Sequence, residues 1–171
     1  MPPTPESVTL PTTAQRHDFI LLKTWLLVGV TDALFASAVS VTVPPLSNPL
    51  KVFQGVASVL IGKDAMNGGA ATGVFGLMMH FSVALFWSTV FVLAVRNSAT
   101  LRGMLRTGWG AFAIAAVYGM SIWLIMSLGV IPALVHRPPN ITLRWVVQLI
   151  GHIPFVAGPM VLVNRTRANH S

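Results

Sequence analysis

The chain has 171 residues, of which 54% are hydrophobic and only 9% are charged, and its mean hydropathy is +0.73. Soluble domains carry about a quarter charged residues, so this composition excludes an ordinary soluble fold and indicates an integral membrane protein. The absence of cysteine excludes a disulfide scaffold, a thiolate nucleophile and a cysteine-ligated metal centre. The net charge of +7 comes from basic residues scattered beside apolar stretches, so we expect no nucleic-acid partner.

Residues 1–18 are polar and contain four prolines, which favours an extended arm over a helix. Four apolar stretches follow, each long enough to cross about 30 Å of hydrocarbon as a helix. They are residues 19–43, 70–95, 108–135 and 145–163. The sequence therefore predicts an all-α fold, a four-helix transmembrane bundle over residues 19–163, with a basic C-terminal tail at residues 164–171.

A short helix is predicted between the first two spans, over residues 49–61. Asn48 has the character of an N-cap, and Pro49 suits the first helical position. Apolar residues then recur at helical spacing until Gly62, which ends the pattern. A helix of this length cannot span a bilayer, so we expect it to lie in the interface or to be re-entrant.

The orientation follows from the basic residues near the ends of the spans. Seven lie on the side that holds both termini and the 96–107 loop, and four lie on the other side. The seven are Arg16, Lys23, Arg96, Arg102, Arg106, Arg165 and Arg167, and the four are Lys51, Lys63, Arg137 and Arg144. The positive-inside rule then predicts a multi-pass membrane protein with both termini in the cytoplasm.

Polar side chains within the spans are the candidate functional residues. An ionisable side chain at the centre of a bilayer costs roughly 3 kcal/mol on insertion scales, so each one needs a partner or a function. Counted at about 1.5 Å per residue, the candidates fall at similar depths, about 10–17 Å below the outer boundary. We predict that they form one buried polar layer, and the candidates are Asp32, His80, His152, Gln148, Ser121 and Tyr118.

Small residues mark the face of the second span that carries His80. Gly69, Gly73 and Gly76 share that face, and glycines let neighbouring helices approach closely. We therefore expect these three glycines to be helix-packing positions that point into the bundle.

Three interpretations of the polar layer stay open. In the first, Asp32 and the two histidines satisfy one another and fix the register of the helices. In the second, His80 or His152 ligates haem or (bacterio)chlorophyll, although no flanking motif requires a cofactor and none is predicted. In the third, an Asp–His relay moves protons or substrate. No motif of soluble catalysis occurs, so we expect no enzymatic activity.

The stretch PLKVFQGVASVLIGKDAMNGGAATGVFGLMMHFSVALFW resembles one in uncharacterised bacterial inner-membrane proteins with four predicted spans. The shared elements are a short helix ending in Leu-Ile-Gly, a Gly-Gly entry into the second span, and the step from His80 to Phe81. The segment GHIPFVAGPMVLVNR is similar too, so the likeness covers residues 25–167. The resemblance implies the four-span layout and a bacterial origin, and it carries no established activity or site residue.

The function expected from these observations is that of an accessory or structural subunit in a larger bacterial membrane complex, photosynthetic or respiratory. The expected partners are the lipid bilayer and other membrane subunits, or a second copy of the chain. An extended proline-rich arm loses little entropy on docking, so we expect residues 1–18 to lie on a neighbouring subunit. The alternatives are a small transporter or proton-conducting protein, and a haem- or pigment-binding subunit.

Overall fold

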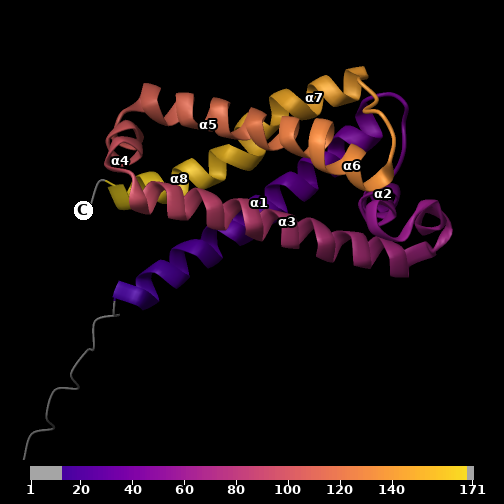
Figure 1. Ribbon diagram of the computed structural model, residues 1–171, viewed down its shortest axis with the longest axis horizontal. Coiled ribbons are helices and arrows are strands. Elements are labelled where there is room, and N and C mark those ends of the chain that lie inside the picture. The colour runs from indigo at the N-terminus through magenta and orange to yellow at the C-terminus, as the bar shows by residue number, and fades with distance from the viewer. Residues whose placement is uncertain (1–12, 169–171) are drawn as a thin grey trace, which may run out of the picture.

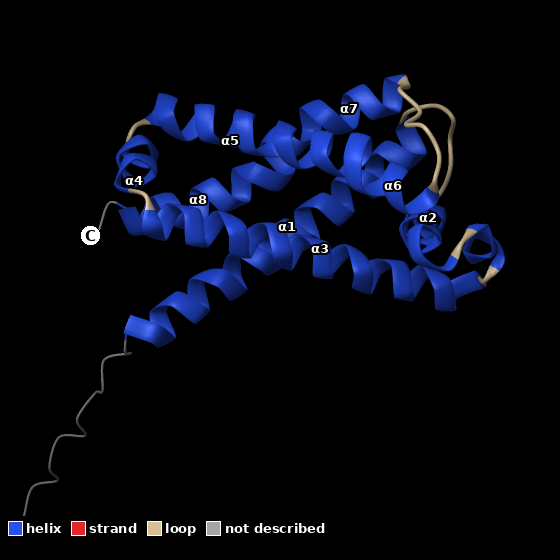
Figure 2. Ribbon diagram, in the orientation of Figure 1, coloured by secondary structure: helices blue, strands red, loops and turns tan. Residues whose placement is uncertain are grey.

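The fold is built from helices joined by short loops, as seen in the computed structural model, which describes residues 13–168 (Figures 1 and 2). Four helical stretches have the length and hydropathy of membrane spans: Asp18–Thr42, Gly69–Asn97, Gly108–Val135 and Leu143–Thr166. The first two correspond to helices α1 (Thr13–Thr42) and α3 (Gly69–Asn97). The predicted all-α, four-span fold is thus confirmed, and the chain is an integral membrane protein with four spans.

The ends of the predicted segments shift slightly. Helix α1 begins at Thr13, inside the segment predicted as an extended arm, and residues 1–12 lie outside the described part of the chain. At the other end, helix α8 (Gly158–Ala168) continues through most of the predicted tail.

A short helix, α2 (Pro49–Ile61), lies between the first two spans as predicted. The side chain of Asn48 accepts a hydrogen bond from the backbone N–H of Lys51 at 3.0 Å, which caps its first turn. Gly62 ends the helix with a φ of +81°, a conformation that glycine adopts without steric cost. A turn of 3₁₀ helix, η1 (Lys63–Asn67), then leads into α3.

One helix was not predicted from the sequence. Helix α4 (Ala99–Arg106) occupies the connection that had been expected to be a loop. The side chain of Ser98 caps it by accepting from the backbone N–H of Leu101 at 3.2 Å, and Leu105 is fully buried. A capping serine and one inward leucine are enough for a helix this short, but they give no long periodic pattern.

The last two spans each contain a π-helical segment. The third span comprises α5 (Gly108–Leu124), the π segment η2 (Ile125–Val130) and α6 (Ile131–Val135). The fourth comprises α7 (Leu143–His152), the π segment η3 (Ile153–Ala157) and α8. Prolines lack the N–H that an α-helix uses, so Pro132, Pro154 and Pro159 account for the widened turns.

The two ends of the bundle differ (Figure 1). The start of α1, helix α4 and the end of α8 gather at one end, whereas α2 and η1 lie at the other. The 96–107 connection is therefore on the same side as both described ends of the chain. Which of these ends faces the cytoplasm stays a prediction from the basic residues.

Candidate functional site

Two of the predicted polar residues form a pair across the contact between the first and second spans. Nδ1 of His80 lies 4.0 Å from Oδ2 of Asp32. The side chain of His80 is 14% exposed and that of Asp32 is 20% exposed, so neither is fully sealed from its surroundings. The depth and face of each residue in its helix had predicted this pairing.

The other ring nitrogen of His80 fixes the position of the imidazole. Nε2 lies 3.1 Å from the carbonyl oxygen of Gly29, one turn before Asp32 on α1. A carbonyl oxygen only accepts, so Nε2 carries the proton and donates it. The rings of Phe53 from α2 and Phe81 pack edge-on against the imidazole, with centroids 6.0 and 5.8 Å away.

His152 forms its ring hydrogen bond within its own helix. Its Nδ1 donates to the carbonyl of Gln148 at 2.7 Å, one turn earlier in the same helix. The side chain is 6% exposed, and its ring centroid is 4.8 Å from that of Trp123 on α5.

The remaining predicted residues occupy different positions. Tyr118 donates its hydroxyl to the carbonyl of Trp87 at 2.8 Å, which connects the third span to the second. The backbone carbonyl of Gln148 accepts the hydrogen bond from His152, and Ser121 is half-buried on α5. The polar groups are therefore spread over several interhelical contacts, and a single polar layer stays a prediction.

The predicted packing glycines face the short helix α2. A Cβ at Gly76 would lie 1.8 Å from the carbonyl oxygen of Phe53, and one at Gly73 would lie 2.3 Å from the side chain of Leu50. Gly69, by contrast, has a φ of +62° and no heavy atom within 4 Å of that position. Two of the three glycines thus bring α2 close to α3, which in turn places Phe53 beside His80.

Sequence reasoning missed three further side chains that connect elements. Trp25 donates its indole N–H to the carbonyl of Phe81 at 2.8 Å, and Thr31 donates to the carbonyl of Phe155 at 2.6 Å. Arg144 donates to the carbonyl of Val43 at 2.8 Å and also to that of Pro45. Proline at position 159 was the available signal for the Thr31 contact, because it leaves the carbonyl of Phe155 without a helical donor.

The donor arrangement distinguishes the two histidines as ligands. His152 donates through Nδ1, which leaves a lone pair on Nε2, the usual arrangement of a histidine that binds a metal. His80 donates through Nε2 to Gly29, so its lone pair is on Nδ1, which faces Asp32 at 4.0 Å. The ring of Trp123 lies beside that of His152, and haem or (bacterio)chlorophyll ligation through His80 or His152 stays a prediction. Within the described residues, no group of three or more His, Asp or Glu side chains could hold a metal ion.

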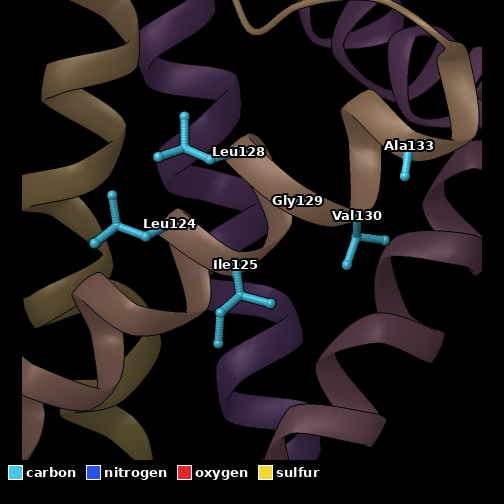
Figure 3. A pocket seen from close by; sticks show the side chains of 6 residues that line it. All are labelled: Leu124, Ile125, Leu128, Gly129, Val130 and Ala133. Carbon is cyan, nitrogen blue, oxygen red and sulfur yellow. The ribbon is translucent and has the colours of Figure 1, made fainter.

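An open groove lies along the third span at η2 (Figure 3). Its lining is entirely apolar and consists of Leu124, Ile125, Leu128, Gly129, Val130 and Ala133. Small residues at 129 and 133 stand between larger ones, which hollows the surface there. These side chains are exposed on a membrane span, as expected of a surface that contacts lipid.

Compared with known proteins, the chain matches no protein-family model, no curated protein and no solved structure. The resemblance to bacterial four-span proteins therefore stays a prediction, and the four membrane spans are what can be stated of its class.

Proposed function

We propose that this protein is a non-catalytic structural subunit of a larger bacterial membrane assembly. The observation that supports the proposal is the way its spans are joined. Four spanning side chains each donate to a backbone carbonyl of another span: Trp25, Thr31, His80 and Tyr118. Bonds of this kind hold helices in register in a bilayer, because no water is present there to form hydrogen bonds with the same donors and carbonyls.

A backbone carbonyl ends a hydrogen-bond chain, because it accepts but has no proton to pass on. A relay across the membrane would instead link side chains that both donate and accept. The four bonds therefore suit a rigid scaffold better than a proton pathway.

The outer surface leaves room for partners. Fully buried residues make up between 17% and 39% of the most apolar window of each span, so every span keeps an apolar surface outside the bundle. Lipid or another subunit must cover this area, which includes large side chains such as Leu34, Phe86 and Val117.

The proposal is tested by isolating the protein from its native membranes. A tagged chain extracted in mild detergent should migrate as a larger particle that contains other membrane proteins in a fixed ratio. Deleting residues 1–13, most of which lie outside the described part of the chain, should reduce that ratio while the spans remain inserted. The proposal would be contradicted if the purified particle has the mass of one chain and the truncated form migrates as the full chain does.

Proton binding is the second candidate function, and the geometry of Asp32 and His80 favours it. Nε2 of His80 must carry a proton to donate to Gly29. Nδ1 then faces the carboxylate of Asp32 at 4.0 Å, where a proton on either group would turn two acceptors into a donor and an acceptor. The pair is therefore a candidate site for one exchangeable proton.

This candidate predicts a proton that can be exchanged within the membrane. In infrared difference spectra across a pH titration, a carboxyl or imidazole band should change in the wild type and disappear in Asp32→Asn. Spectra without such a band at any pH would remove this candidate and leave the scaffold proposal unaffected.

A further inference from the structure

Three buried hydrogen-bond donors lie on the third span and on α7, where the rings of Trp123 and Trp145 meet. They are Nε1 of Trp123, Oγ of Ser127 and Nε1 of Trp145, and none has a partner among the described residues. The ring of Trp123 lies between those of Trp145 and His152, with centroids 6.2 and 4.8 Å away. Side chains from two different spans thus form one aromatic cluster, defined as Trp123, Ser127, Trp145 and His152.

Other buried donors without a partner among the described residues are Nε1 of Trp87, Oγ of Ser88 and Nε of Arg144, and the cluster differs in that it brings two such indoles from different spans together. The indole of Trp25 and the phenol of Tyr118 each reach a carbonyl of another span. Hydroxyls such as those of Ser37 and Ser82 donate to the preceding turn of their own helix. A buried donor without a partner loses its hydration and gains nothing in return, so a protein retains such groups mainly where something else binds them.

The backbone at Ser127 departs from a regular α-helix. Ser127 lies in the π segment η2, where the wider turn changes the position of the carbonyls that precede it. Single π turns within α-helices are found frequently at functional sites. The same turn follows directly after α5, which carries Trp123.

The chemistry of the cluster defines what it can bind. It offers three donors and the lone pair on Nε2 of His152, so donors predominate. The matching ligand brings oxygen acceptors and an apolar body that can pack against indole rings. We propose that this aromatic cluster binds the carbonyl oxygen of a membrane-soluble molecule, either a quinone ring or the ester group of a phospholipid.

The indole N–H groups can be observed directly, by NMR of the full chain with ¹⁵N-labelled tryptophan. The protein is placed in nanodiscs of diether phospholipid, which has no ester carbonyl, and each indole signal is assigned with a Trp→Phe variant. A short-chain benzoquinone is then titrated in. In a separate sample, diester phospholipid replaces the diether lipid.

If a quinone is the ligand, the signals of Trp123 and Trp145 should move and saturate during the titration. If the ester is the ligand, they should move when the lipid is exchanged. Ser127→Ala should weaken the apparent affinity by about tenfold or more, since it removes one of three donors. Trp109 is 78% exposed and serves as the control, whose signal should follow neither change.

Two results would overturn the proposal. One is that the Trp123 and Trp145 signals stay the same with quinone and with either lipid, as expected if internal water already binds the donors. The other is that Trp109 responds as strongly as they do, since this would show general partitioning into the bilayer. Neither result bears on whether the protein is a subunit of an assembly.

Discussion

The hydroxyl of Thr31 on the first span lies 2.6 Å from the carbonyl oxygen of Phe155 in the π segment of the fourth. Phe155 precedes Pro159 by four residues, and proline has no N–H to give to that carbonyl. A side chain of one helix therefore replaces the donor that another helix lacks. The same hydroxyl is 2.7 Å from the carbonyl of Leu27, so it is shared between the two helices.

Replacing Thr31 with valine should destabilise the bundle by about 0.5–1.5 kcal/mol, the range measured for hydrogen bonds between membrane helices. Reversible unfolding in detergent measures the change. Thr89→Val is the matched control, because the Thr89 hydroxyl is bonded within its own helix to Leu85 at 2.8 Å. In a Pro159→Ala background the loss should shrink, since alanine supplies the missing N–H. Equal losses in both backgrounds would show that Thr31 does not compensate for the proline.

Gly76→Ala should separate α2 from α3. The added methyl would lie 1.8 Å from the carbonyl oxygen of Phe53, so the backbone itself has to move. We expect a destabilisation of about 1–3 kcal/mol, as for other overpacked contacts. Gly55→Ala on α2 meets nothing within 4 Å and should be neutral or stabilising, because alanine favours helix. Similar melting temperatures for the two variants would refute close packing at this position.

The orientation can be measured with single cysteines, since the natural chain has none. Gly103→Cys on α4 and Lys63→Cys on η1 are both exposed and lie at opposite ends of the bundle. An impermeant thiol reagent added to intact cells should label position 63 and leave position 103 unlabelled until the membrane is opened. The reverse pattern would place both termini outside and overturn the inference from the basic residues.

The sequence predicted the spans and α2 because both depend on long, repeated features. An apolar run of suitable length implies a span, and the Asn48-Pro49 pair with Gly62 marks the ends of the short helix. The pairing of Asp32 with His80 also followed from depth and helical face. Each of these features can be counted along a single helix, without knowing how the helices pack together.

The missed features depend on how the helices meet. The convergence of His152 with Asp32 stays a prediction, because the carbonyl of Gln148 in its own helix already accepts from Nδ1 at 2.7 Å. A local partner of this kind competes with a distant one, and helical phase alone does not decide between them. The π segments also rotate every later residue relative to an ideal helix, so faces counted across Pro154 are displaced.

The central claim is that the buried polar side chains hold the spans together. A measurement of proton flux tests this claim most directly. Proteoliposomes with a pH gradient and a fluorescent pH dye compare the wild type, Asp32→Asn, His80→Gln and empty vesicles. The account predicts no flux above that of empty vesicles for any form, and a lower melting temperature for His80→Gln, which loses the imidazole that bridges Asp32 and Gly29. Flux through the wild type that Asp32→Asn abolishes, with the melting temperature unchanged, would contradict the scaffold proposal and establish the pair as a proton carrier.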